Sequence, residues 1–269
     1  MTQENKQKAG IPAFALIVIV LSVFVGWLIY KFVLGAGSNF EGGTSEGKPI
    51  TLLGNMYKGG IIVPVLIGIL IIVLTFAIER LLTIMRAKGS GSVEGFVRKV
   101  REMLSSGNID QAIAECDKQR GSVANVIRSG LVKYGQVEKE TILDKEAKVA
   151  AIQKSLEEAT ALELPMLSKN LVIISTCASI STLVGLLGTV LGMIKAFAAL
   201  AQAGAPDAIS LANGISEALV NTFLGILAAA LGIIFYNLFN NLIDSLTYGM
   251  DEAGFSIVQT YSATHKERE

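Results

Sequence analysis

The sequence is poor in the side chains that build metal centres, disulfide frameworks and many active sites. It contains two cysteines, Cys116 and Cys177, neither in a CxxC or zinc-type spacing, and one histidine, His265, in the polar stretch SATHKERE. A disulfide framework is therefore not expected, and His265 is expected to be solvated. No Walker loop, catalytic triad or metal-ligand spacing occurs. These absences predict a protein with no metal and no cofactor that is neither an ATPase nor a hydrolase.

An excess of charge of one sign is also missing. The 23 Lys and Arg residues balance the 23 Asp and Glu residues, so the formal net charge is +0. Nothing in this balance favours nucleic acid as a partner. What is abundant is apolar: 51% of the residues are hydrophobic, which is more than an ordinary soluble domain of this length needs. The composition therefore predicts the lipid bilayer as the first partner.

Four apolar runs are long enough to cross a membrane, which takes about 20 helical residues for about 30 Å of hydrocarbon. They are residues 11–30, 59–78, 171–194 and 218–243. The first run is long for a signal-peptide core and is followed by only a weak cleavage site, so we expect a retained helix at the lipid-facing rim. The sequence thus predicts an all-α integral membrane protein with four spans.

Lys and Arg residues near the ends of these runs predict the orientation. The segments ERLLTIMRAKG and RKVR follow the second run and place residues 84–168 in the cytoplasm. The loop at 201–213 has no Lys or Arg and is placed outside. Basic residues lie near both ends of the chain, namely Lys6, Lys8, Lys266 and Arg268. We therefore expect a multi-pass protein with both termini in the cytoplasm.

These patterns divide the chain into eight segments. They are residues 1–34 (N-terminal tail and additional span), 35–58 (outer segment), 59–83 (second span), 84–168 (cytoplasmic helical region), 169–200 (third span), 201–213 (short outer loop), 214–243 (fourth span) and 244–269 (cytoplasmic C-terminal helix and tail). The charged, helically periodic region between the second and third spans predicts a bundle that continues the long membrane helices.

The third span carries more glycine than a membrane anchor needs. Within GLLGTVLGMIKAF, Gly185, Gly188 and Gly192 stand at i, i+3 and i+7 and share one helical face. Small residues on one face let two helix backbones approach closely. Gly225 continues a similar stripe on the fourth span. We expect these four glycines to serve helix packing.

Polar side chains on the third and fourth spans predict a path for protons. The candidate pore-lining residues are Ser181, Thr182, Thr189, Asn221 and Thr222. Hydroxyl groups can hold water because they both donate and accept hydrogen bonds, but they do not store a proton at neutral pH. The alternative for each hydroxyl is a bond to the carbonyl of its own helix four residues earlier. Neither span has an acid at mid-depth, so a carboxylate must come from elsewhere.

Glu217 lies near the outer end of the fourth span, where a carboxylate is costly unless it has a partner. Lys195 is the first candidate, because it lies near the outer end of the third span and the connection between the spans is short. The alternative for Lys195 is snorkelling, in which its charged end reaches the membrane surface.

The stretch GLLGTVLGMIKAF, followed by GISEALVNTFLGILAAALGIIFYNLF, resembles the ExbB/TolQ proton-channel family, whose wider relatives include MotA flagellar stator subunits. The resemblance covers roughly residues 95–245 and is closer to ExbB. It implies a homo-pentamer around a central pore in the bacterial inner membrane. The pore holds a dimer of a single-span partner, ExbD, whose aspartate provides the missing carboxylate. Proton motive force would then act on TonB to energise transport across the outer membrane.

The resemblance also assigns roles to residues. It implies that Thr189 and Thr222 are the pore threonines and that Glu217 is the family's glutamate. Two features depart from the family pattern: the additional N-terminal span, and Asn221 at a position where small residues are usual. Asn221 either adds a polar group to the pore or bonds across helices. A TolQ-like protein, a flagellar or gliding-type stator subunit and a structural scaffold remain alternatives.

Overall fold

The computed structural model describes residues 13–201 and 207–265 of the chain. The predicted loop at 201–213 is therefore described only in part. Lys6, Lys8, Lys266 and Arg268, which contributed to the predicted orientation, lie outside the described residues.

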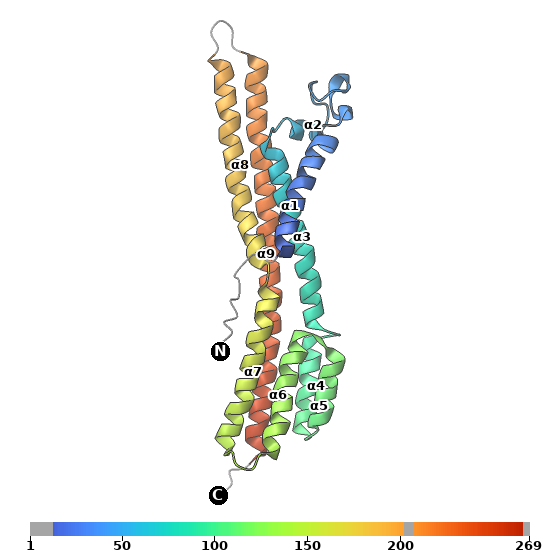
Figure 1. Ribbon diagram of the computed structural model, residues 1–269, viewed down its shortest axis with the longest axis vertical. Helices are drawn as coiled ribbons and strands as arrows, with labels where there is room; N and C mark the ends of the chain where they lie inside the picture. Colours follow the sequence, from blue (N-terminus) through green and yellow to red (C-terminus); the bar gives the residue numbers. More distant parts are fainter. Residues whose placement is uncertain (1–12, 202–206, 266–269) are drawn as a thin grey trace, which may run out of the picture. The chain divides into compact units, whose positions relative to one another are not determined.

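Helices make up all the regular elements of the described residues, beside one isolated β-bridge between Phe40 and Pro49. The long helices are α1 (Ala13–Leu28), α3 (Ile62–Lys88), α6 (Gly121–Lys139), α7 (Lys145–Ser168), α8 (Leu171–Leu200) and α9 (Ala208–Thr264) (Figure 1). The shorter ones are η1 (Ile29–Leu34), η2 (Gly37–Asn39), η3 (Glu41–Gly43), α2 (Leu52–Tyr57), α4 (Val93–Ser105) and α5 (Ile109–Gln119). The all-α prediction is confirmed.

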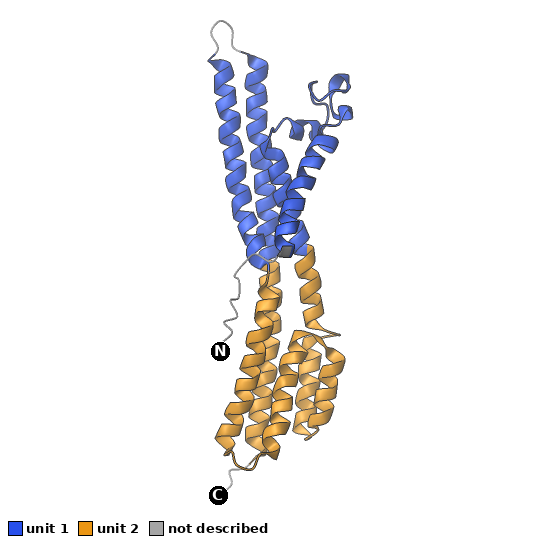
Figure 2. Ribbon diagram, in the orientation of Figure 1, with its two compact units in different colours: residues 1–77, 170–236 blue, residues 78–169, 237–269 orange. Residues whose placement is uncertain are grey.

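The chain divides into two compact units, coloured separately in Figure 2. Unit 1 comprises residues 1–77 and 170–236, and unit 2 comprises residues 78–169 and 237–269. The helices α3 and α9 contribute residues to both units. The predicted fourth span is thus the first part of a helix of 57 residues, because no proline interrupts the sequence between Ala208 and Thr264.

Unit 1 leaves many large apolar side chains exposed and buries several small ones. On α8, Leu183 and Ile194 are 64% and 60% exposed, whereas Ala178 and Ala196 are buried. Soluble proteins bury most of their large apolar side chains, so this distribution suits a helix surrounded by lipid or by other helices. Four helical stretches are long and apolar enough to cross a membrane, namely Phe14–Leu34, Ile62–Ser105, Lys145–Leu200 and Ala208–Thr264. The prediction of a four-span membrane protein is confirmed.

The additional N-terminal helix α1 packs against α3 where both helices carry a glycine. A Cβ atom on Gly26 would lie 2.6 Å from the carbonyl oxygen of Pro64, and one on Gly68 would lie 3.0 Å from the Cα atom of Val23. The outward face of α1 carries exposed apolar side chains such as Ile17. This surface suits a lipid-facing helix, which remains our prediction for the assembled protein.

Residues 35–58, which we call the connector segment, form a folded cap between α1 and α3. The buried amide of Asn39 donates to the carbonyl oxygens of Val33 and Leu34, at 2.8 and 3.0 Å. The hydroxyl of Thr51 donates to Asn39 Oδ1 at 2.9 Å and accepts from the backbone N–H of Gly54 at 3.1 Å, which caps α2. The segment is therefore tied to the end of the preceding helix.

Unit 2 is a helical bundle built from α4 to α7 and the second part of α9. Its buried side chains include Phe96, Val100, Ile127, Leu131, Ile152 and Ile257. Near the end of α9, His265 stacks on Tyr261 with ring centroids 4.2 Å apart, and Tyr134 meets Tyr261 edge-on at 4.7 Å. His265 is therefore part of an aromatic cluster, rather than the fully solvated residue that its polar sequence context suggested.

Arg80 of α3 closes the end of α7. Its side chain is buried, and Nη1 donates to the carbonyl oxygens of Met166 and Leu167 at 3.2 and 3.3 Å. The guanidinium also binds Glu79, with Nε 2.7 Å from Oε2. The last carbonyls of a helix have no donor within the helix, and a cation is favourable at that end. Arg80 therefore acts as a C-terminal cap for α7.

Replacing Arg80 with methionine should destabilise the protein by about 2–3 kcal/mol. Breaking a fully buried ion pair costs about 3–5 kcal/mol, and the Glu79 side chain is 28% exposed, which lowers that cost. The measurement is the thermal unfolding midpoint in detergent. The matched control is Arg86→Met, because Arg86 is an exposed residue of the same helix. Equal midpoints for the two variants would show that the cap contributes nothing.

Candidate functional site

Helices α8 and α9 approach each other closely along their small residues. A Cβ atom on Gly192 would lie 2.6 Å from the backbone nitrogen of Ala218, and one on Gly185 would lie 3.1 Å from the Cα atom of Gly225. A Cβ atom cannot come within 3.0 Å of a backbone atom without movement, so glycine lets these two backbones lie almost in contact. The close approach brings the polar side chains of the two helices together.

Gly192→Ala should separate α8 from α9. The new methyl group would lie 2.6 Å from Ala218 N and 2.7 Å from Gly214 O, and overpacking of this kind typically costs about 1–3 kcal/mol. The measurement is the unfolding midpoint and the yield of folded protein in detergent. Gly135→Ala in α6 is the control, because a Cβ atom there meets nothing within 4 Å. The control should be neutral or stabilising by up to about 1 kcal/mol, and equal losses would contradict the packing role.

The hydroxyl groups of Thr189 and Thr222 meet across the interface between α8 and α9. Their Oγ1 atoms are hydrogen-bonded to each other. Thr189 Oγ1 also lies 3.2 Å from the carbonyl oxygen of Gly185, and Thr222 Oγ1 lies 3.1 Å from that of Ala218. Both side chains are half-buried. The two spans therefore present one joint polar point in apolar surroundings.

Ser181 and Thr182 lie about two helical turns before Thr189. Ser181 is fully buried, and its hydroxyl donates to the carbonyl oxygen of Ala178 at 2.9 Å. Its backbone carbonyl faces Gly225, where a Cβ atom would lie 2.7 Å away. Thr182 is half-buried. The bond of Ser181 runs three residues back along α8, whereas the contacts of Thr189 with Gly185 and of Thr222 with Ala218 run four residues back, the local bond that the sequence left open for each hydroxyl.

Glu217 and Lys195 form an ion pair between α9 and α8. Lys195 Nζ lies 2.6 Å from Oε1 and 2.8 Å from Oε2 of Glu217. The Glu217 side chain is 9% exposed and that of Lys195 is 57% exposed. The pair is therefore asymmetric, because the carboxylate is buried while the ammonium group is partly exposed. A charge pair of this kind lies between a surface pair, worth about 0–1 kcal/mol, and a buried one.

Asn221 of α9 is fully buried against α8 and the turn before α3. Its Nδ2 atom donates to the carbonyl oxygen of Gly59 at 2.9 Å. Its Oδ1 atom has no hydrogen-bond partner among the described residues. A Cβ atom on Gly188 would lie 2.4 Å from the Cβ atom of Asn221, so the glycine makes room for the amide. The amide of Asn221 thus bonds to a turn residue, whereas the sequence left open a polar group in the pore or a bond across helices.

Comparison with known proteins identifies the domain that contains these residues. Residues 119–252 match the MotA/TolQ/ExbB proton channel family. The chain carries a domain of this family. The family domain includes α8 and most of α9, and therefore both members of the hydroxyl pair and of the ion pair. The resemblance drawn from the two signature stretches is confirmed.

Three relatives illustrate how far the similarity reaches. An ExbB-like biopolymer transport protein of Synechocystis is 32% identical over 45% of this chain and 59% of its own length. The Tol-Pal system protein TolQ of Pseudomonas aeruginosa is 31% identical over 48% of this chain and 56% of its own length. The biopolymer transport protein ExbB of Salmonella typhimurium is 30% identical over 58% of this chain and 66% of its own length. In each case the matched stretch spans less than two thirds of the relative.

Several residues around the MotA/TolQ/ExbB site were missed by reasoning from the sequence. Gly214 packs on α8, where a Cβ atom would lie 2.7 Å from the backbone nitrogen of Ala196. The positions Gly214, Ala218 and Gly225 follow at i, i+4 and i+11, and this stripe of small residues could have been found. The contact with the carbonyl of Gly59 could not have been predicted, because Gly59 lies 162 positions from Asn221 in the sequence.

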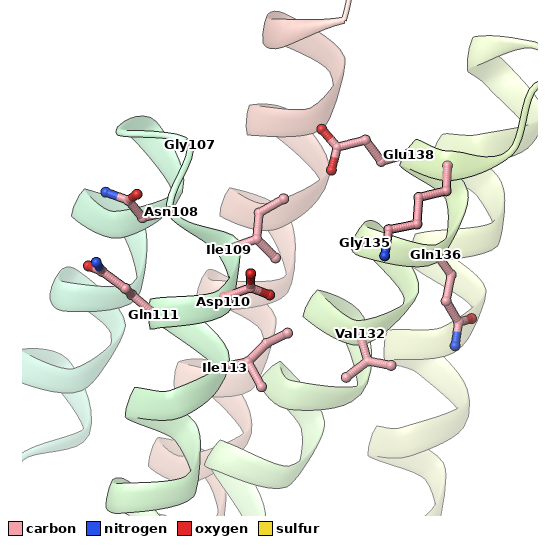
Figure 3. Close-up of a pocket in the computed structure, with 11 residues that line it drawn as sticks. Gly107, Asn108, Ile109, Asp110, Gln111, Ile113, Val132, Gly135, Gln136 and Glu138 are labelled. Atoms are coloured by element: carbon pink, nitrogen blue, oxygen red, sulfur yellow. The ribbon is translucent and has the colours of Figure 1, made fainter.

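Other parts of the protein show no catalytic or metal-binding site among the described residues. Burial raises the pKa of the Cys116 thiol to about 12, so that group stays protonated at neutral pH and is a poor nucleophile. A surface cavity of about 610 Å³ lies between α5 and α6 (Figure 3). Ile109, Ile113 and Val132 line it together with polar residues. The described residues contain no group of three or more His, Cys, Asp or Glu side chains that could hold a metal.

Proposed function

We propose that the chain is the proton-channel subunit of an ExbB-like motor of the bacterial inner membrane. The observation that carries this proposal is the hydrogen-bonded pair of hydroxyls, Thr189 and Thr222, at the interface of two apolar spanning helices. Hydroxyl groups can bind water and exchange hydrogen bonds with a titrating group. The nearby ion pair of Glu217 and Lys195 fixes the two helices to each other at the next turns.

A second chain must provide the group that stores the proton. Glu217 is the only carboxyl group in α8 and in residues 208–236 of α9, and Lys195 binds both of its oxygens. A proton path through the membrane needs a group that gains and loses a proton near mid-depth or a continuous chain of water, and the hydroxyls of this chain hold water but do not store a proton. We infer that an ExbD-like single-span partner inserts such a group into the pore of a homo-pentamer. The motor would act on a TonB-like protein, with no nucleic acid involved.

TolQ-like work is the second candidate function. The TolQ protein of Pseudomonas aeruginosa is 31% identical to this chain over the matched stretch, and the ExbB protein of Salmonella typhimurium is 30% identical. Both candidates share the proton path and differ in the protein on which the motor acts. Complementation separates them: the chain and its partner should restore energised uptake in a strain lacking ExbB, or envelope integrity in a strain lacking TolQ.

Proton flux into liposomes tests the channel itself. The purified chain is reconstituted alone and together with the single-span protein that copurifies from native membranes, and a pH-sensitive dye reports the flux. We expect flux only when both proteins are present, and none when the partner's membrane aspartate is replaced with asparagine. Equal flux from the chain alone, or no flux from the complex, would contradict the proposal. A purely structural scaffold would give no flux in either preparation.

A further inference from the structure

The turn that joins α2 to α3 has its backbone carbonyls satisfied from two directions. The carbonyl oxygen of Tyr57 accepts from the hydroxyl of Tyr30 at 3.1 Å and from the backbone N–H of Gly60 at 3.3 Å. The carbonyl oxygen of Gly59 accepts from Asn221 Nδ2 at 2.9 Å. A buried carbonyl without a donor is costly, and more so away from water. The amide of Asn221 therefore meets a requirement of this turn.

Helix α9 presents three side chains of one face to the same turn. A Cβ atom on Gly60 would lie 2.5 Å from Glu217 Oε1, and one on Gly59 would lie 2.7 Å from Val220 Cγ1. With Asn221, these α9 residues stand at i, i+3 and i+4, which is one helical face. Gly60 has a φ of 76°, a conformation that other residues adopt only with strain. The turn is thus shaped to lie directly on α9.

The last residue of α2, Tyr57, packs against the end of the first span. The rings of Tyr57 and Tyr30 stack with centroids 4.6 Å apart. A Cβ atom on Gly35 would lie 2.7 Å from Tyr57 Cε2, so η1 and the start of the connector segment also lie against this tyrosine. Continuous packing therefore runs from α9 through the turn to the connector segment.

We propose that Asn221 is a positioning residue in a clasp that joins α9 to the connector segment, so that the two move as one body. The clasp consists of Asn221, Glu217 and Val220 of α9, Gly59 and Gly60 of the turn, and the Tyr30–Tyr57 pair. Its consequence rests on the proposed function: during proton-driven work, the helix that carries Thr222 is held by the connector segment at the level of Glu217.

Hydrogen exchange of the full-length protein in lipid nanodiscs tests the clasp. Asn221→Leu keeps the size of the side chain and removes the donor, which leaves the Gly59 carbonyl unsatisfied. Amides of α2 and of the turn up to Val63 should then exchange about tenfold faster, the factor expected for a lost buried hydrogen bond. Amides of α6, in unit 2, should be unchanged. Asn55→Leu is the control, because Asn55 is exposed on α2.

Two further variants approach the clasp from its other sides. Gly60→Ala should give an effect at least as large, because it adds strain and a contact with Glu217. Tyr30→Phe keeps the ring stack and removes only the bond to Tyr57, so it should fold normally and give a smaller increase in exchange. If Asn221→Leu fails to fold, these two variants decide. Exchange in both that equals the Asn55→Leu control would overturn the proposal.

A distance measurement tests whether the connector segment and α9 move together. Spin labels replace Glu46 and Ile209, both exposed, in a chain whose two cysteines are replaced by serine. We expect a narrow distance distribution in the parent chain and a clearly broader one with Asn221→Leu. Equally broad distributions in both would overturn the clasp. These readouts need no proton flux, so an inactive channel would contradict the proposed function and leave this inference standing.

Discussion

Replacing Thr189 or Thr222 with valine should lower proton-driven work by about 100-fold, the scale on which one positioned proton-transfer group contributes. Valine has nearly the shape of threonine but neither donates nor accepts a hydrogen bond. The two hydroxyls meet across the α8–α9 interface, so either substitution breaks the pair. Assembly should persist, because a hydrogen bond between membrane helices is worth only about 1 kcal/mol. The measurement is growth that depends on energised uptake, with the yield of oligomer measured in parallel.

Serine at the same two positions is the matched control. It retains the hydroxyl and loses one methyl group, so Thr189→Ser and Thr222→Ser should keep much of the activity. A packing role predicts the reverse order, since valine would fill the space and serine would leave a small void. Full activity in both valine variants would refute the assignment of this pair to the proton path.

Lys195→Met should cost about 2 kcal/mol of stability, and Glu217→Gln in the same chain should restore at least half of it. The reason is the asymmetry of the pair: the Glu217 side chain is 9% exposed and that of Lys195 is 57% exposed. Removing the lysine leaves a buried carboxylate without its counter-charge, which is the costly half of a broken pair. We expect a smaller loss of stability than for a fully buried pair because the ammonium group of Lys195 is half exposed.

A double-mutant cycle on the unfolding midpoint in detergent measures this coupling. The control cycle uses Lys154 and Glu158, an exposed pair 3.8 Å apart on α7, for which the coupling should stay below about 0.5 kcal/mol. Additive effects of Lys195→Met and Glu217→Gln would show that the pair does not hold α8 to α9. Glu217→Ala should also reduce assembly, since it empties the space against Gly60.

The sequence was informative where short-range periodicity or charge carried the information. Apolar length predicted the four spans, and the spacing of Gly185 and Gly192 predicted a face on which α8 could pack closely. The ion pair of Glu217 and Lys195 could be predicted because a carboxylate in a span needs a counter-charge and the connection between the spans is short. Polarity placed Thr189 and Thr222 among five pore candidates, and only the family resemblance singled them out, because hydroxyl spacing alone does not distinguish a proton path from local bonds.

Contacts between distant segments could not be predicted in the same way. The polarity of Asn221 was visible, but its acceptor is a backbone carbonyl, and every residue has one. The role of Arg80 was hidden for the same reason: it looked like one of several basic residues after a span, and its partners are the carbonyls of Met166 and Leu167. Side chains that bind backbone atoms leave no complementary residue type in the sequence.

The two threonine hydroxyls cannot form all of their possible hydrogen bonds at the same time. Thr189 and Thr222 have two hydroxyl protons between them, but their oxygens face three bonds: one to Gly185 O, one to Ala218 O and one to each other. When one threonine donates to the other, it releases its own carbonyl, and the direction can reverse. The pair can therefore offer a lone pair to a carboxylic acid or a proton to a carboxylate. A titrating group that moves past this point would find a suitable partner in either of its protonation states.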